Sequence, residues 1–139
     1  LIGLCMGAPV ARAPQGWGNG RMTYDWHRPD LPFCQNRKDI SLLVSHQDQA
    51  VELPKGATLV ASSAFCPVAG ITVGQEAFCV QAHPEFDVGF SQYLMGEKRA
   101  RMGEAEYAAR SESLLGGHEG ADIARMVVAF LENSPRSAG

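Results

Sequence analysis

Short apolar runs separated by Gly, Pro and polar residues fill the first part of the chain. After His83 the apolar residues recur at the spacing of a helix. Runs of this length, bounded by turn residues, are typical of β-strands. The predicted strands cover residues 1–4, 17–27, 40–44, 58–61, 65–73 and 77–80. Pro67 and Gly70 interrupt one of them, so we expect that strand to be bent or at a sheet edge. The run at 77–80 predicts a buried strand of an α/β sheet.

Two helices are predicted after this strand. Asp87 suits the N-cap position of a long helix that extends to about residue 115, where a Gly-Gly pair breaks the chain. One face of that helix is predicted to be apolar, with Phe90, Tyr93 and Leu94. Another is predicted to be solvated, with Lys98, Arg99 and Arg101. Residues 121–131 predict a second helix, because apolar side chains recur at positions i, i+4, i+7 and i+8. They are Ile123, Val127, Phe130 and Leu131.

The tripeptide His83-Pro84-Glu85 follows the strand at 77–80 after two residues. Ligand-handling groups of α/β sheets lie just past the carboxyl ends of the strands, and His83 has that position. Pro84 fixes one backbone angle, and residues i and i+2 of an extended segment point the same way. Glu85 is therefore placed to hydrogen-bond His83 and hold its tautomer, as a base and its orienting carboxylate. The alternative is a loop histidine beside a solvated glutamate.

The segment at 3–7, Gly-Leu-Cys-Met-Gly, has the pattern G-x-C-x-G, the thiol counterpart of a nucleophile elbow. Its glycines permit a sharp strand-to-helix turn that exposes the thiol of Cys5 at the top of a sheet. A following helix N-terminus would stabilise the thiolate and supply N–H donors to an oxyanion. The next residues include Pro9 and Pro14, however, and predict no such helix. A buried cysteine in a glycine-rich turn is the alternative.

A polar cluster, Ser45-His46-Gln47-Asp48-Gln49, follows the predicted strand at 40–44. Several polar groups at a strand end are what a small polar ligand needs for its orientation. A polar turn accounts for the same residues without a ligand. Trp17 and Trp26 could line a pocket, although packing in the core is the simpler explanation.

The 139 residues correspond to one domain, and 45% hydrophobic with 19% charged residues is an ordinary soluble globular composition. The net charge of −3 and the lack of a basic stripe argue against nucleic acid as a partner. No apolar stretch approaches the roughly 20 residues that span a bilayer, and residues 1–10 lack the features of a signal peptide. We therefore expect a soluble, cytoplasmic protein with no membrane partner.

The four cysteines form no C-x-x-C pair and have no histidine at zinc-ligand spacing. They are Cys5, Cys34, Cys66 and Cys79. The sequence therefore predicts reduced thiols, no metal site and no cofactor. A phosphate-binding loop is not predicted either, because the glycine-rich segment at 16–20 lacks the Lys-Ser/Thr that such a loop requires.

The chain resembles the class I, triad-type glutamine amidotransferases in three segments. They are GLCMG around Cys5, SHQDQAVELPKGATLVASS from Ser45, and VQAHPEF up to Phe86. The chain is most similar to stand-alone bacterial proteins related to the amidotransferase domain of GMP synthase. The resemblance implies a flavodoxin-like three-layer α/β/α sandwich with a mostly parallel sheet, of which the chain holds the C-terminal part. It assigns residues 1–132 to a partial amidotransferase domain and residues 133–139 to a polar tail.

The same resemblance implies a catalytic triad. Cys5 is the expected nucleophile, His83 the general base and acid, and Glu85 the residue that orients His83. The implied reaction releases ammonia from glutamine through a glutamyl thioester, without a cofactor. Transfer of the ammonia would require a synthetase domain or partner, which this sequence does not contain.

Four positions are expected to bind the substrate. The backbone N–H of Met6 would form one half of the oxyanion hole. Ser45, Gln47 and Asp48 match positions whose backbone atoms, in the family, hold the amino and carboxylate ends of glutamine.

The chain departs from the family in two places. After Gly7 the family continues with His-Gln and a helix, whereas here roughly ten residues, about one helix, are missing before the segment at 16–20. The opening strands and the glycine that completes the oxyanion hole have no counterpart before Leu1. Two explanations are open. The sequence is a fragment or omits residues, as its start without Met suggests, or it is a true truncation, which we expect to be inactive and poorly soluble.

Three functions are therefore open. The first is a glutamine-hydrolysing, amidotransferase-like cysteine hydrolase. The second is a γ-glutamyl peptide hydrolase, which would use the same triad on γ-glutamyl amides. The third is a non-catalytic remnant that acts as a binding or regulatory domain, which the gap after Gly7 favours. The small-molecule substrate of either enzyme would be glutamine or a γ-glutamyl compound.

Overall fold

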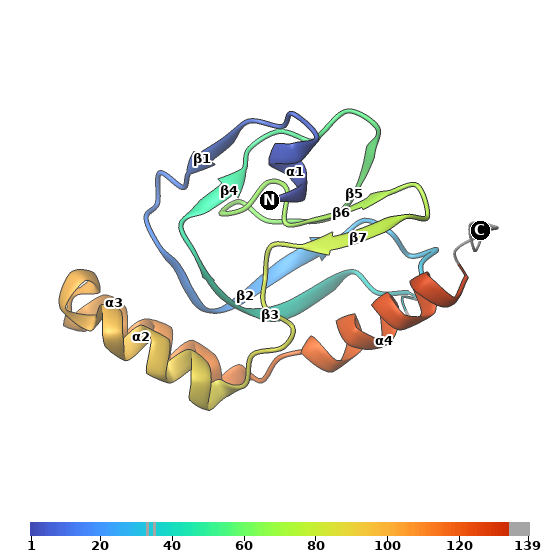
Figure 1. Cartoon of the computed structure of the whole chain (residues 1–139). Helices are drawn as coiled ribbons and strands as arrows, with labels where there is room; N and C mark the ends of the chain where they lie inside the picture. Colours follow the sequence, from blue (N-terminus) through green and yellow to red (C-terminus); the bar gives the residue numbers. More distant parts are fainter. Residues whose placement is uncertain (33, 35, 134–139) are drawn as a thin grey trace.

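An antiparallel sheet of five strands in the order β3-β2-β5-β6-β7 forms the centre of the structure (Figure 1). Its strands are β2 (Gly18–Trp26), β3 (Asp39–His46), β5 (Ala57–Ser62), β6 (Gly70–Val73) and β7 (Ala77–Val80). A separate antiparallel pair consists of β1 (Val10–Arg12) and β4 (Asp48–Ala50). This computed structural model describes residues 1–32, 34 and 36–133 of the chain.

The predicted mostly parallel sheet is wrong for the described residues, in which every strand pair is antiparallel. Parallel neighbours need a crossover of about a dozen residues or more, usually with a helix, whereas antiparallel neighbours can be joined by a short turn. Residues 74–76 alone connect β6 to β7, and no helix lies between β2 and β7 in the described part. The order of the elements therefore produces hairpins instead of crossovers.

Residues 1–4 do not form the predicted strand. They belong to α1 (Ile2–Cys5), in which the N–H groups of Cys5 and Met6 donate to the carbonyls of Leu1 and Ile2, both at 3.0 Å. Backbone groups of a strand must pair with a neighbour, and no strand of the described part pairs with this segment. A short apolar run cannot by itself distinguish a strand from a helix, which explains the wrong prediction.

The strands at 17–27, 40–44 and 58–61 are confirmed by β2, β3 and β5. Of the strand predicted at 65–73 only β6 forms, because a turn precedes it in which the Ser63 N–H donates to the Cys66 carbonyl at 2.9 Å. The strand at 77–80 is confirmed as β7, but it lies at the edge of the sheet and is half-buried instead of fully buried. An edge strand has a neighbour on one side only, so its side chains remain partly open to solvent.

The predicted long helix is divided into α2 (Val88–Met102), α3 (Glu104–Ser113) and the 3-10 turn η1 (Leu114–Gly116). The predicted N-cap is confirmed, since the Asp87 carboxylate accepts from the Phe90 N–H at 2.7 Å. Gly103 divides the two helices at φ +82°, a conformation that favours glycine. The predicted apolar face is wrong: Phe90 and Tyr93 are 45% and 62% exposed, and the buried residues of α2 are Ser91 and Met95.

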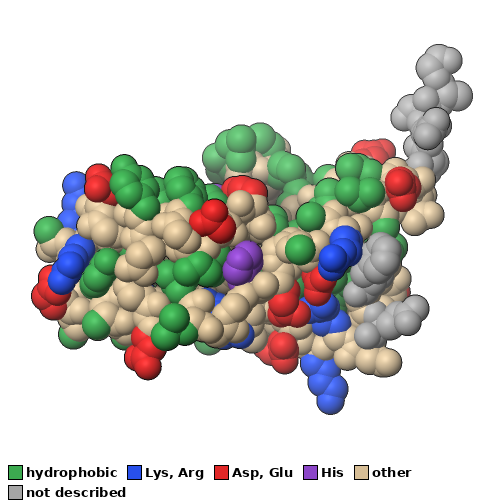
Figure 2. Space-filling model, turned by 90° about the horizontal axis from the view of Figure 1, so that it is seen from below, with side chains coloured by type: hydrophobic (Ala, Val, Ile, Leu, Met, Phe, Trp, Pro, Cys, Tyr) green, Lys and Arg blue, Asp and Glu red, His purple; other side chains and the backbone are tan. Residues whose placement is uncertain are grey.

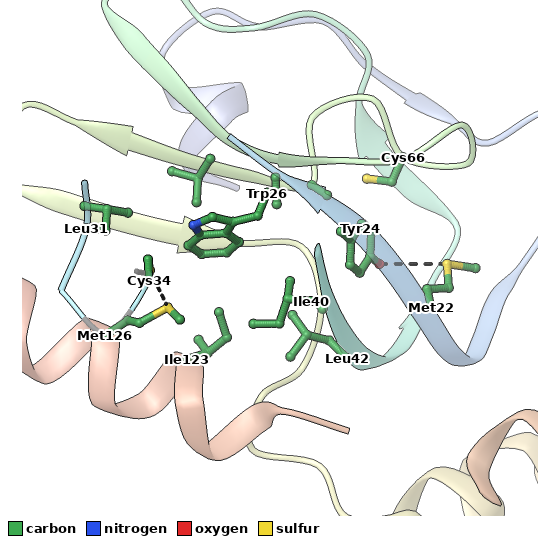
Figure 3. Packing of buried hydrophobic residues seen from close by; sticks show 14 of the residues in the cluster. Met22, Tyr24, Trp26, Leu31, Cys34, Ile40, Leu42, Cys66, Ile123 and Met126 are labelled. Atoms are coloured by element: carbon green, nitrogen blue, oxygen red, sulfur yellow. Dashed lines mark hydrogen bonds between the residues drawn. The ribbon is translucent and has the colours of Figure 1, made fainter. Parts of the chain in front are cut away.

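The second predicted helix is confirmed as α4 (Gly120–Glu132), and its amphipathic face packs on the sheet. Ile40 and Leu42 of β3 lie against Ile123 and Met126 of α4 (Figure 3), whereas Leu43 packs against Met95 of α2. Successive side chains of a strand point to opposite faces, so β3 has a helix on each face. Residues 134–139 of the predicted polar tail lie outside the described residues.

The surface seen in Figure 2 carries acidic and basic side chains interspersed with apolar ones. Within the part of the chain that the structure describes, no helix has the length and apolar character needed to cross a membrane.

Candidate active site

His83 and Glu85 form a hydrogen-bonded pair shortly after β7. The His83 Nδ1 lies 2.8 Å from the Glu85 Oε1, so the hydrogen bond expected from the tripeptide is confirmed. The ring nitrogen donates, because an ionised carboxylate only accepts. Partial burial acts to raise the pKa of Glu85, but the hydrogen bond from His83, a backbone hydrogen bond and the His83 charge hold this pKa below its ordinary value. The pair therefore leaves Nε2 as the ring nitrogen that can exchange a proton with a substrate.

The neighbours of His83 fix the position of its ring. Its backbone N–H donates to the carbonyl of Leu43 in β3 at 2.9 Å. The imidazole stacks on Phe86, with ring centroids 4.0 Å and planes 6° apart, and Phe86 meets Phe90 of α2 edge-on at 4.8 Å. The His83 side chain remains 33% exposed, so β3 and α2 hold the ring without closing it off from solvent.

Gly120, the first residue of α4, lies against the backbone of Pro84, and a Cβ at this position would overlap the Pro84 carbonyl oxygen. We expect Gly120→Ala to lower the free energy of unfolding by about 1–3 kcal/mol, because backbone must shift to admit the methyl group. Urea unfolding measures the effect. Gly96→Ala is the matched control, since a Cβ at Gly96 in α2 meets no atom of the described residues within 4 Å. That control should be neutral or stabilising, and equal stability of the two variants would contradict the close packing.

Cys5 is the last residue of α1, and its thiol is exposed. The predicted strand-to-helix elbow is not formed, because a helix precedes the thiol and the strand β1 follows it. A helix C-terminus carries the negative end of the helix dipole, so α1 does not supply the expected stabilisation of a thiolate. No hydrogen bond between described residues involves the Cys5 Sγ. His83 and Glu85 are thus connected by a hydrogen bond, and Cys5 has no hydrogen bond to either of them.

Two residues whose backbone is expected to bind the substrate already make backbone hydrogen bonds within the chain. The N–H of Met6 donates to the Ile2 carbonyl at 3.0 Å. The carbonyl of Gln47 accepts from the Ala13 N–H at 2.7 Å. The first contact belongs to α1, and the second joins the segment after β1 to the residue between β3 and β4.

Ser45 and Asp48 lie at the end of β3 and in β4. The Ser45 Oγ accepts from the Nζ of Lys98, 2.5 Å away in α2. The Asp48 carboxylate is 65% exposed and lies 3.6 Å from the Nε of Arg12 across the β1–β4 pair. Ser45 is thereby linked to α2, which the sequence did not predict, because Lys98 was assigned to a solvated face.

A cleft of about 350 Å³ lies between α1 and the sheet. Its walls come from residues 1–4, Val10, residues 48–50, residues 68–71 and residues 79–81. The cleft therefore borders the segment that carries Cys5, the substrate-binding candidate Asp48, and Gln81, two residues before His83. Among the described residues, no group of three or more His, Cys, Asp or Glu side chains could hold a metal ion.

His46, the last residue of β3, was predicted only as one member of the polar cluster after the strand, and its burial was not predicted. It is 7% exposed, and neither ring nitrogen has a hydrogen-bond partner among the described residues. Its ring meets Phe65 edge-on at 5.8 Å. Burial and, secondarily, the charge of His83 lower the pKa of His46 to about 4. The alternation of Ile40, Leu42 and Val44 on the buried face of β3 predicts that His46 is buried too.

Similar sequences are found among proteins that act on γ-glutamyl compounds and glutamine. γ-Glutamyl peptidase 3 of Arabidopsis thaliana is 44% identical over 77 residues, which cover 55% of this chain and 31% of that protein. GMP synthase of Burkholderia vietnamiensis is 43% identical over 57 residues, which cover 40% of this chain and 11% of that enzyme. No protein-family model matches the chain. The chain thus spans about a third of the length of the first relative.

Solved structures with the same fold cover nearly all of the chain. A glutamine amidotransferase from Thermotoga maritima matches 94% of this chain and 56% of its own, with a TM-score of 0.69 and 19% identity. One from Methylobacillus flagellatus matches 99% of this chain and 61% of its own, with a TM-score of 0.69 and 11% identity. At these identities the likeness shows the fold, and the chain corresponds to somewhat more than half of each solved chain.

Proposed function

The chain belongs to the class I glutamine amidotransferase family, and we propose that it is a cysteine hydrolase that cleaves the side-chain amide of glutamine. The products are glutamate and ammonia. The observation that carries the proposal is the 2.8 Å hydrogen bond between His83 and Glu85. An imidazole oriented by an ionised carboxylate is what a general base requires.

Cys5, His83 and Glu85 have distinct roles in the proposed reaction. The Cys5 thiolate attacks the amide carbon of glutamine, and the carbonyl oxygen becomes an oxyanion. His83 donates a proton to the leaving nitrogen, ammonia departs, and a glutamyl thioester remains. His83 then takes a proton from water, which attacks the thioester and releases glutamate and the Cys5 thiolate. Glu85 holds the His83 tautomer through both steps.

Four residues are proposed to bind the substrate around the reacting carbon. The N–H of Met6 is one proposed donor to the oxyanion, which requires its present hydrogen bond to Ile2 to open. Backbone atoms of Ser45, Gln47 and Asp48 are the proposed contacts of the amino and carboxylate ends of glutamine. If the ammonia is used in a synthesis, its acceptor is bound by a synthetase domain or partner.

Hydrolysis of γ-glutamyl peptides is the second candidate function. It breaks the same type of bond, with an amine instead of ammonia as the leaving group. Relatives named γ-glutamyl peptidases align over 77 to 101 residues, whereas those named GMP synthases align over 47 to 57 residues. The longer alignments favour a γ-glutamyl peptide as an alternative substrate.

A non-catalytic binding domain is the third candidate. It is favoured by the exposed position of Cys5 at the end of α1, without a hydrogen bond to His83. A domain of this kind would bind glutamine or a γ-glutamyl compound without forming a thioester.

One experiment separates the three candidates. The protein is incubated with glutamine or a γ-glutamyl dipeptide, and the release of glutamate, ammonia and amino acid is followed. A parallel sample is treated with an electrophilic glutamine analogue, and the labelled cysteine is found by peptide mass spectrometry. We expect ammonia release and labelling of Cys5, with Cys79, which is half-buried in β7, as the internal control. Faster cleavage of the dipeptide would favour the second function, and neither turnover nor labelling would leave the third.

A further inference from the structure

Lys98 of α2 is a half-buried cation with neutral neighbours. Its Nζ lies 2.5 Å from the Ser45 Oγ and 3.4 Å from the Asn19 Oδ1. It also lies 4.1 Å from the ring centroid of Trp17, close enough for a cation–π interaction. The side chain therefore crosses from the helix to the ends of β2 and β3, where two neutral oxygens and an aromatic face hold its ammonium group.

No carboxylate neutralises this ammonium group among the described residues. The adjacent Arg99 differs, because it forms an ion pair with Glu104. Burial lowers the pKa of Lys98, and no acidic group raises it. A partly buried charge without a counterion is costly, since neutral oxygens replace only part of its hydration. An anionic ligand would remove this cost.

The ammonium group lies near the part of β3 that anchors His83. Leu43 and Ser45 are two residues apart in the strand, so their side chains share a face and lie about 7 Å apart along it. The Leu43 carbonyl accepts from the His83 N–H, and Phe86, on which His83 stacks, packs with the cluster of Leu43 and Met95. Met95 and Lys98 are neighbours on one face of α2. The end of β3 therefore contacts both this cation, through Ser45, and the segment of His83, through Leu43.

We propose that Lys98, Ser45 and Trp17 form a subsite that binds a carboxylate of the substrate. This inference rests on the proposed function, because it takes the ligand to be glutamine or a γ-glutamyl compound. Lys98 supplies the charge, and Trp17 holds the ammonium group in place. Since the Ser45 Oγ accepts its hydrogen bond from Lys98, the Ser45 hydroxyl hydrogen is available to a carboxylate oxygen. The ligand would thus receive one charge-assisted and one neutral hydrogen bond.

Two carboxylates have the required chemistry. One is the α-carboxylate of the glutamyl group, which every substrate contains. The other belongs to the leaving amino acid of a γ-glutamyl peptide and is absent from glutamine. Binding of the second would make Lys98 a determinant of specificity for peptides over glutamine.

The test compares two probes on protein that carries Cys5→Ala, so that neither probe is hydrolysed. γ-Glutamylglycine has both carboxylates, and γ-glutamylethylamide has only the glutamyl one. Isothermal titration measures their Kd values with Lys98 intact and with Lys98→Met, which keeps an unbranched apolar stem of similar length over Trp17. We expect Lys98→Met to raise the Kd of γ-glutamylglycine about 10- to 100-fold, the usual effect of losing a hydrogen bond to a charged group. Lys98→Arg should recover part of the affinity.

The pattern of losses identifies the carboxylate. If only the Kd of γ-glutamylglycine rises, the subsite binds the carboxylate of the leaving amino acid. If the Kd values of both probes rise equally, the subsite binds the α-carboxylate of the glutamyl group. Unchanged affinities in Lys98→Met, or no binding of either probe with Lys98 intact, would overturn the proposal. Arg101→Met is the matched control, because it removes an exposed charge from the same helix. Hydrolysis is tested by product release, whereas the subsite is tested by Kd values without turnover. A failure of the proposed hydrolysis is therefore distinguishable from a failure of this subsite.

Discussion

Replacing Cys5 by alanine is expected to reduce glutamine hydrolysis about 10⁴-fold or more, to the background of the assay. The proposed thioester requires the sulfur of Cys5, and no other described thiol has a comparable position, because Cys34 and Cys66 are buried and Cys79 is half-buried in β7. Ammonia release at saturating glutamine measures the loss. Cys79→Ala is the control and should retain turnover. Equal activity of Cys5→Ala and the unmodified protein would contradict the proposed nucleophile.

His83→Asn is expected to act on the same step. Loss of a general acid–base group lowers kcat by about 10²- to 10⁴-fold. Because nucleophile and base act as a unit, the double variant of Cys5 and His83 should lose no more activity than Cys5→Ala alone. His27→Asn is the control, since His27 is exposed and its Nε2 is bonded to the Ser62 Oγ at 2.8 Å. Additive losses in the double variant would show that the two residues act in different processes.

Local patterns predicted those elements whose conformation depends on neighbouring residues. The Asp87 cap and α4 agree with the structure, because each depends on spacing within one helix. The direction of the strands was predicted wrongly, since it depends on which segments meet across the sheet. The strand predicted at residues 1–4 was wrong for a similar reason, because an apolar run forms a strand only if another strand pairs with it.

The same difference between local contacts and contacts of distant segments applies to the candidate site. The hydrogen bond between His83 and Glu85 joins residues i and i+2 and was predictable from the tripeptide. The position of Lys98 was not predictable, because it depends on which face of α2 packs against the sheet. The side of α2 that meets β2 and β3 carries Ser91, Met95 and Lys98 at i, i+4 and i+7, whereas the apolar residues Phe90 and Tyr93 face solvent. Apolar spacing therefore selected the wrong face and assigned Lys98 to solvent.

Acidification from pH 7 to pH 5 is expected to lower the free energy of unfolding by about 2 kcal/mol through His46 alone, and by about 3 kcal/mol at pH 4. Burial, together with the charge of His83, lowers the pKa of His46 to about 4, below its ordinary value of 6.5. The unfolded chain therefore binds a proton near pH 6.5, while the folded chain does not until about pH 4. Unfolding takes up this proton between the two values, so stability falls as the pH falls through that range.

Urea unfolding between pH 7 and pH 5 isolates this contribution. Carboxyl groups with lowered pKa values, such as those of Asp30 and Glu85, lose their stabilising effect only at still lower pH. His46→Leu is expected to remove most of the pH dependence in this window. It should also retain or raise stability at pH 7, because two buried ring nitrogens with no partner in the described part of the chain are replaced by an apolar group of similar size. His27→Leu is the control, since an exposed histidine has no comparable burial. If His46→Leu unfolded with the same pH dependence as the unmodified protein, the acid sensitivity would have to arise from other groups, and His46 would not be held neutral by its surroundings.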